Sequence, residues 1–216
     1  MKNFVIKIQV TWVLCLILSL AAFSQDQGYI QTASNALKAK DYQKAIENYT
    51  KAIEKKSNYA PSYYGRGLAY YYMDKYDLAL DDFARAISYD AKYHQAFYSA
   101  GLCYTKLGKY SNAINNLEGA IELFGSSPDY YYALGNAYQF DEKYEKALAS
   151  YSKAIEINPN YGLAFYGRGV MNKQLGNLNP AIEDLEKYIY LQENKDGLEQ
   201  EARRLINDIN EEKMKK

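Results

Sequence analysis

The sequence is poor in the residues from which most catalytic and metal sites are built. Its 216 residues include one histidine and two cysteines. Cys15 lies in an N-terminal segment that we expect to be removed, and the remaining His94 and Cys103 cannot assemble a typical zinc site. The lone histidine also leaves no Ser-His-Asp or Cys-His nucleophile set. We therefore expect no enzymatic activity and no cofactor.

An excess of charge of either sign is also lacking. The chain carries 26 basic and 26 acidic residues, whereas nucleic-acid-binding proteins show a basic excess or stripe. No nucleic-acid partner is therefore expected. The single tryptophan, Trp12, lies near the N-terminus, within a segment that we expect to be removed. Carbohydrate binding is therefore a weaker alternative, because tryptophan is the side chain that sugars prefer to stack on.

Long apolar runs are missing except at the N-terminus. Lys2 and Lys7 precede an apolar stretch from Ile8 to Phe23, which is shorter than the roughly 20 residues of a membrane-spanning helix. Ala22 and Ser24 place small residues at its end, so residues 1–24 are predicted to form a signal peptide cleaved before Gln25. An uncleaved anchor is the alternative, and the membrane would be reached only through it or through a partner. The protein is expected to be exported, periplasmic or secreted, in a bacterium.

What the sequence does contain is a pattern with a fixed period. Alanines recur at one constant interval, each followed by Ile or Leu and, one helical turn further on, by a large side chain. Upstream of each alanine, the last four units carry an aromatic pair and then a glycine, the first pair being Tyr63-Tyr64 with Gly67. The spacing of these small and large residues places them on one face of each of two helices per unit. The recurring alanines are Ala45, Ala79, Ala113, Ala147 and Ala181.

The repeated helix–turn–helix unit resembles the tetratricopeptide repeat in its length and its pattern. The match is closest in the fourth copy, which carries the pattern residues Tyr131, Leu134, Gly135, Tyr138, Ala147, Tyr151, Ala154 and Pro159. The resemblance implies an all-α fold, an α-solenoid with a right-handed superhelix of five helix pairs. The predicted copies span residues 26–59, 60–93, 94–127, 128–161 and 162–195. The repeated glycine is expected to let paired helices approach closely, so Gly135→Leu should cost several kcal/mol by overpacking.

A single helix is predicted over Asp196 to Lys213, within a C-terminal segment of residues 196–216. Asp196 with Glu199 forms the pattern of a capping box. An apolar stripe follows, and we expect this helix to cap the last copy. A partner-binding helix is the alternative. The stripe consists of Leu198, Ala202, Leu205, Ile206 and Ile209.

Two arginines predict ion pairs inside the repeats. Arg66 and Arg168 occupy equivalent positions on the first helix, and only in those two copies does the second helix carry an aspartate at the facing position. Because a half-buried arginine needs a carboxylate partner, we predict salt bridges with Asp82 and Asp184. The alternative is that the arginines hold a carboxylate of a ligand. Cys103, close to the packing stripe, is expected to be a buried inert thiol.

By resemblance to the family, the first helices of the stacked copies line a concave groove. Tyrosine suits adaptable peptide contact, so the groove is predicted to bind a protein or peptide partner, as in a scaffold or adaptor. The tyrosines could instead only pack between helices. A second class of function is a structural or self-assembling part of an envelope complex, acting through the outer face or the ends. The predicted binding residues are Tyr64, Leu68, Tyr98, Leu102, Lys106, Tyr132, Asn136 and Tyr166.

Overall fold

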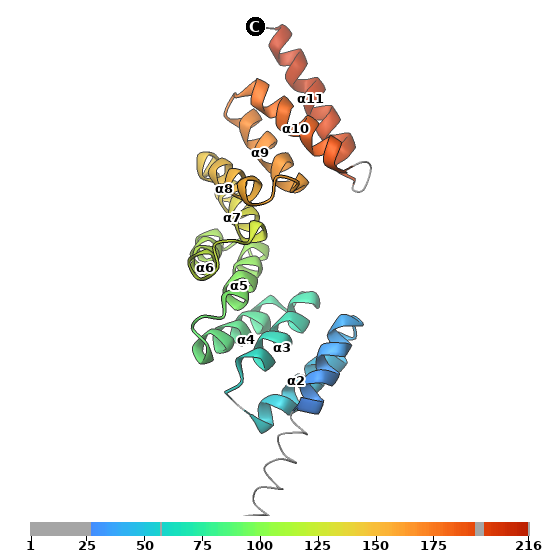
Figure 1. Ribbon diagram of the computed structural model, residues 1–216, viewed down its shortest axis with the longest axis vertical. Coiled ribbons are helices and arrows are strands. Elements are labelled where there is room, and N and C mark those ends of the chain that lie inside the picture. Colours follow the sequence, from blue (N-terminus) through green and yellow to red (C-terminus); the bar gives the residue numbers. More distant parts are fainter. Residues whose placement is uncertain (1–26, 57, 193–196, 216) are drawn as a thin grey trace, which may run out of the picture. The chain divides into compact units, whose positions relative to one another are not determined.

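The computed structural model describes residues 27–56, 58–192 and 197–215 (Figure 1). The predicted signal peptide, residues 1–24, lies outside these described residues. Within them the regular structure is entirely helical, as predicted. None of the described helices is both long and apolar enough to cross a bilayer. The chain divides into two compact units, Met1–Ala91 and Lys92–Lys216.

The first unit contains two helix pairs. A helix over residues 27–38 is followed by α2 (Tyr42–Lys55), and α3 (Ala60–Tyr72) is followed by α4 (Tyr76–Tyr89). Each helix packs on the next, because α2 contacts α3 and α3 contacts α4. The core between the first helix and α2 is made of small alanines around one large ring, Tyr49, which is 5% exposed.

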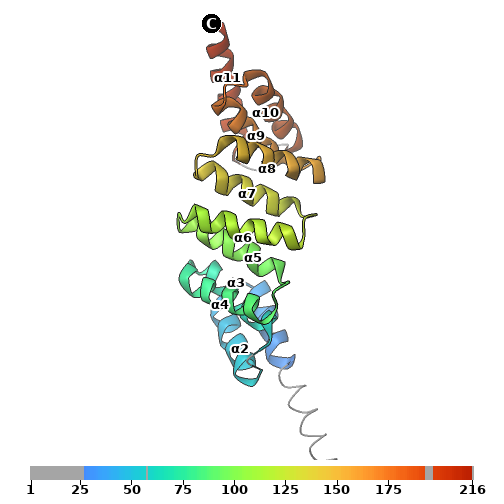
Figure 2. The ribbon, with the colours of Figure 1, turned by 90° about the vertical axis from the view of Figure 1, so that its left-hand side faces the viewer.

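The second unit continues the same arrangement. It contains α5 (His94–Lys106), α6 (Tyr110–Leu123), α7 (Pro128–Phe140), α8 (Tyr144–Ile157), α9 (Gly162–Gln174), α10 (Leu178–Gln192) and α11 (Glu199–Met214). Figure 2 shows α5 to α8 stacked one after another. Consecutive helices of this unit contact each other, and α7 also contacts α5 and α9, the first helices of the pairs before and after it. The first helices of successive pairs therefore adjoin and present a common face.

Every turn inside a pair uses one left-handed residue. The backbone φ is positive at the equivalent position of each turn, at Lys40, Asp74, Gly108, Glu142 and Gly176. In the second pair, the amide of Lys75 donates to the carbonyl of Tyr70 and that of Asp74 to Tyr71, both at 3.0 Å. These bonds satisfy the last carbonyls of the first helix, as in a Schellman motif. Only two of the five turns use glycine, so the turn type could not be derived from glycine positions alone.

The repeated glycines do allow close helix approach. A Cβ added at Gly135 would lie 2.5 Å from the ring of Tyr151, and one at Gly67 would lie 2.7 Å from Phe83. Gly167, in the following pair, lies against the same Tyr151 ring, because a Cβ added at Gly167 would lie 2.7 Å from that ring. Tyr151 is fully buried. Its ring therefore sits between two helices, α7 and α9, each of which supplies a glycine.

The last helix packs as predicted, although it begins later. α11 starts at Glu199, and Asp196 of the predicted capping box lies outside the described residues. Ala202 and Ile209 are fully buried against the apolar side chains of α10 and α9. Leu198, predicted as part of the stripe, is instead 37% exposed because it stands at the N-cap before the helix.

Candidate functional site

The two predicted arginine pairs are confirmed as internal contacts. Arg66 donates to both oxygens of Asp82, from Nε and Nη2 at 2.8 Å each. Arg168 does the same with Asp184, at 2.9 and 2.6 Å. Both aspartates are buried, and the bidentate geometry engages both oxygens of each carboxylate. These arginines join the two helices of a pair.

Each arginine also reaches back to the preceding pair. Nη1 of Arg66 donates to Thr50 on α2 at 3.1 Å. The equivalent atom of Arg168 donates to Ser152 on α8 at 3.3 Å. In both places a hydroxyl side chain on the second helix of the preceding pair accepts a hydrogen bond from the arginine. The guanidinium groups thus fix three helices at once.

Three tyrosines in the second unit occupy equivalent places on its first helices. Tyr98 lies on α5, Tyr132 on α7 and Tyr166 on α9, and each is half-buried. We call these three residues the tyrosine row. Each ring rests on another ring: Tyr98 on Tyr130 at 4.6 Å between centroids, Tyr132 on Tyr151 at 5.9 Å, and Tyr166 on Tyr188 at 5.2 Å. The row is therefore held in place by the core behind it.

Hydroxyl partners separate the row from the packing tyrosines. Tyr138 donates to Glu118 at 2.7 Å, and Tyr161 donates to Asp129 at 2.6 Å. Burial, together with that acceptor, raises the pKa of Tyr138 to about 12. Within the described part of the chain, by contrast, the hydroxyls of Tyr132 and Tyr166 form no hydrogen bond. These two groups are free to bond with something outside the fold.

Burial makes one member of the row, Tyr166, hold its proton more tightly. The pKa of Tyr166 is raised by burial first and then by the nearby Glu201 and Tyr132. Tyr161, beside the row, has its pKa raised by burial and by its bond to Asp129, with Tyr132 and Tyr98 adding to the effect. Tyr166 therefore stays a neutral hydroxyl, able to donate, throughout the physiological pH range.

The other predicted binding residues differ in what they do. Leu102 is half-buried on α5, and Lys106 is exposed at the end of the same helix. Asn136 on α7 is engaged inside the fold, because its Oδ1 lies 2.8 Å from the hydroxyl of Tyr151. Tyr64 and Leu68 are half-buried on α3 of the first unit, where Tyr64 contacts the ring of Phe83 at 5.8 Å. The structure brings Tyr98, Leu102, Tyr132 and Asn136 into one unit with Tyr166.

An aromatic cluster at the start of α5 was not predicted. His94 stacks on Phe124 at 4.7 Å, and its Nδ1 lies 2.7 Å from the hydroxyl of Tyr130. Tyr130 in turn supports Tyr98 of the row. The sequence did hold a signal, since Tyr130 stands where the other aligned copies have only Gly28, Ser62, Ala96 and Ala164. A large residue at a position of small ones indicates an extra packing contact.

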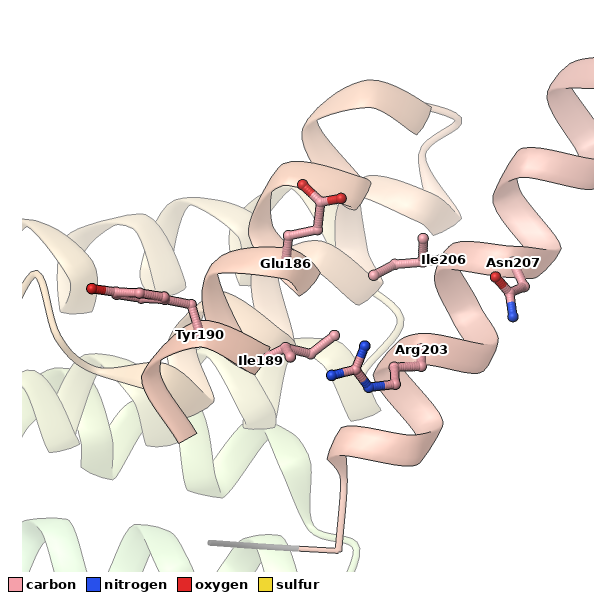
Figure 3. A pocket seen from close by; sticks show the side chains of 6 residues that line it. All are labelled: Glu186, Ile189, Tyr190, Arg203, Ile206 and Asn207. Carbon is pink, nitrogen blue, oxygen red and sulfur yellow. The ribbon is translucent and has the colours of Figure 1, made fainter. Parts of the chain in front are cut away.

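A concave feature lies between the last two helices. A pocket of about 410 Å³ opens between α10 and α11 (Figure 3). Arg203 and Ile206 of α11 point toward Ile189 of α10, whereas Tyr190 projects away and is 71% exposed. Arg203 also binds Glu199 at 2.8 Å, one turn earlier on α11. Arg203 stands 34 residues after Gly169, at the position where the last four repeats carry glycine. In these repeats this position packs against the second helix of the same pair.

Cys103 is fully buried in α5. Burial raises the pKa of its thiol to about 12. We expect no reaction of the native chain with a disulfide reagent such as Ellman's reagent at pH 8, and full reaction after unfolding in guanidinium. Because the folded pKa exceeds the unfolded one, this thiol should also lower stability as pH rises above about 9. A fast reaction in the folded state would contradict the buried placement.

Among the described residues, no group of three or more His, Cys, Asp or Glu side chains is arranged to hold a metal ion.

Comparison with known proteins agrees with this architecture. Tetratricopeptide-repeat family models match residues 37–74, 60–93, 101–139, 128–161 and 164–195. The chain therefore belongs to the tetratricopeptide-repeat family, whose members are generally non-catalytic modules of protein interaction. A search of curated proteins gave no significant match.

Solved structures show the same fold. YrrB, described as a TPR protein with an unusual peptide-binding site, is 28% identical over 82% of this chain and 90% of its own, with a TM-score of 0.69. MamA from Desulfovibrio magneticus RS-1 is 23% identical over 80% of this chain and 97% of its own, with a TM-score of 0.73. PilF from Pseudomonas aeruginosa is 16% identical over 88% of this chain and 90% of its own, with a TM-score of 0.71.

Proposed function

We propose that this protein is a non-catalytic scaffold or adaptor of the bacterial cell envelope. It holds an extended segment of a partner protein against the tyrosine row. The observation that carries the proposal is the row itself, in which three half-buried tyrosines on adjoining helices combine apolar rings with hydroxyl groups. Rigid tyrosines of this kind give contact area at little entropic cost. The peptide-binding site named for YrrB supports this choice.

The envelope location rests on the N-terminal sequence. Lys2, Lys7 and the short apolar run are those of a signal peptide, and cleavage before Gln25 would release the repeats outside the cytoplasm. Expression of the full chain in a bacterium, followed by fractionation and N-terminal sequencing, tests this. A product beginning at Met1 in the cytoplasmic fraction would contradict export.

Affinity capture from an envelope extract tests the binding role. The bait is the chain of residues 25–216, compared with a variant that carries Tyr98→Ala and Tyr132→Ala. We expect the variant to lose at least tenfold in partner recovery while its circular dichroism shows a retained helical fold. Tyr190→Ala is the matched control, because Tyr190 is exposed on α10 away from the row. Equal recovery by the folded double variant would reject the row as the binding face.

A structural role in an envelope complex is the second candidate. The pocket between α10 and α11 favours it, since an exposed Tyr190 at its rim offers an apolar contact at one end of the chain. In that case Tyr190→Ala should lose the partner and the row variant should keep it. The same capture experiment therefore separates the two functions.

A further inference from the structure

The pocket between α10 and α11 lies at a place where the repeats hold a second helix. A Cβ added at Gly101 would lie 2.6 Å from Leu117, and one at Gly169 would lie 3.0 Å from Leu185. The glycine position of a first helix therefore faces the second helix of its own pair. On α11 this position carries Arg203, and here its side chain lines the open pocket of about 410 Å³ (Figure 3).

Glu186, on the α10 side of the pocket, lacks a hydrogen bond that its counterparts make. In three earlier copies the equivalent residue accepts from the next first helix; these residues are Thr50, Glu118 and Ser152. Glu118 accepts from Tyr138 at 2.7 Å, whereas α11 carries Ile206 at the position of Tyr138. Glu186 is exposed and forms no hydrogen bond or ion pair with any residue that the structure describes. Its carboxylate is therefore available to a cation outside the fold.

Arg203, on the α11 side, is the complementary group. Its side chain is 60% exposed, and its Nε and Nη2 both donate to Oε1 of Glu199, at 3.0 and 2.8 Å. Nη1 makes no hydrogen bond within the described ranges, so the guanidinium can bind a second carboxylate while it keeps Glu199. In Figure 3 the carboxylate of Glu186 points away from Arg203. The two groups thus share one pocket without pairing in a single chain.

The apolar part of this surface is specific to the last copy. Tyr190 is 71% exposed, although every earlier copy has a polar residue at its position, namely Glu54, Ser88, Glu122 or Glu156. Lys187 lies over the Tyr190 ring, 5.0 Å from its centroid, and Ile189 and Ile206 line the pocket beside it. A large ring at a position that is otherwise polar, next to two isoleucines, is typical of a contact surface.

Charge complementarity selects a second copy of the chain as the occupant. The pocket carries an unpaired carboxylate on one helix and an exposed guanidinium on the other, so a partner of one charge sign would attract one group and repel the other. A two-fold symmetric contact presents the same surface from both sides. When α11 of each copy faces α10 of the other, Arg203 of each copy meets Glu186 of the other. The formal net charge of the chain is zero, so two copies meet no overall repulsion.

We propose that two copies of this chain associate through α10 and α11 as a two-fold symmetric dimer. Two reciprocal ion pairs between Glu186 and Arg203 fix the register of the contact, and Tyr190, Ile189 and Ile206 of both copies form its apolar part. This inference does not depend on the tyrosine row. It rests on the second candidate function, the structural role, and gives that role a stated partner.

Sedimentation equilibrium of residues 25–216 over a series of concentrations tests the dimer. We expect a molar mass that rises toward twice that of one chain. Glu186→Arg and Arg203→Glu should each weaken self-association at least tenfold, because each substitution places like charges opposite each other in both ion pairs. An equimolar mixture of the two variants should associate as the parent chain does, since every cation then meets a carboxylate. Damage to the fold of either variant would not be repaired by mixing.

The chain offers a matched control for the charge change. Glu122 is exposed on α6, and Glu122→Arg should leave self-association unchanged. The variant with Tyr98→Ala and Tyr132→Ala should also associate as the parent chain does, because the row takes no part in the contact.

A parent chain with the mass of one copy at every concentration would overturn the inference. Self-association that persists in both charge variants, or a mixture that stays monomeric, would overturn it as well. A monomeric parent chain whose Tyr190→Ala variant loses a captured envelope protein would assign the pocket to a different protein. That result would reject the dimer and leave the structural role in place.

Discussion

Replacing Asp82 with alanine should lower the free energy of unfolding by about 3 kcal/mol, because it leaves a partly buried arginine without its carboxylate. The side chain of Arg66 is 19% exposed and that of Asp82 5%. Both oxygens of Asp82 accept from the guanidinium at 2.8 Å. Only the bond to Thr50 and the contact with the Tyr63 ring would remain. Urea unfolding followed by circular dichroism measures the loss.

The chain supplies both controls for this prediction. Asp81 is the exposed neighbour on the same helix, and Asp81→Ala should stay within about 0.5 kcal/mol of the parent. The pair Leu134 and Ser150 occupies the same two positions in the fourth copy. The double variant Arg66→Leu, Asp82→Ser should therefore recover most of the stability lost in Asp82→Ala. A double variant no more stable than Asp82→Ala would show that the cost is not that of an unpaired charge.

Replacing Gly167 with alanine should destabilise the second unit by about 1–3 kcal/mol through overpacking. The new Cβ would lie 2.7 Å from Cζ of Tyr151. The Tyr151 ring cannot move aside, because Gly135 on α7 also lies against it. The Tyr151 hydroxyl is also held, 2.7 Å from Gln139 Oε1. This loss exceeds the roughly 1 kcal/mol that alanine gains over glycine in a helix. Thermal or urea unfolding of the variant measures the net effect.

The packing rule behind this prediction has a direct test. Positions 65, 99, 133 and 167 are equivalent, and each corresponds to one large residue on the second helix of the preceding copy. Where that residue is a tyrosine, Tyr49 or Tyr151, the position holds glycine. Where it is Phe83 or Leu117, the position holds Ser99 or Ala133. The double variant Tyr151→Leu, Gly167→Ala recreates the pair Leu117 and Ala133. Its loss should be clearly smaller than the sum of the two single losses. Gly28→Ala, where nothing lies within 4 Å, should not destabilise the chain. Additive losses would contradict the rule.

The helix pairs and the ion pairs could be predicted because each sequence pattern recurs in more than one copy of the repeat, at the same spacing. Arg66 and Arg168 each have an aspartate at the facing position of the second helix and the other copies do not, so comparison between copies replaced comparison between proteins. The matching of Gly65 and Gly167 to the tyrosines of the preceding helix was equally present in the sequence. It was missed because it joins neighbouring copies, and only the structure shows that those side chains meet.

Other features depend on geometry that no spacing encodes. Lys40, Asp74 and Glu142 adopt left-handed backbone conformations that are held by bonds to the preceding helix. Asn136 was predicted to face a ligand, and the structure shows its side-chain oxygen beside the hydroxyl of Tyr151. The hydroxyl partners of the tyrosines likewise distinguish Tyr132 and Tyr166 from Tyr138, although all three are tyrosines on first helices. For these residues the sequence gives the position on a helix but not the bond.

The most direct test of the binding face is a nuclear magnetic resonance spectrum of residues 25–216 with ring-labelled tyrosine, recorded with and without the captured partner segment. Single Tyr→Phe variants assign the signals. We predict that the ring signals of Tyr98, Tyr132 and Tyr166 shift on binding and that those of Tyr89 and Tyr190 stay. A shift of the Tyr190 signal with an unchanged row would place the partner at the C-terminal end and contradict the account.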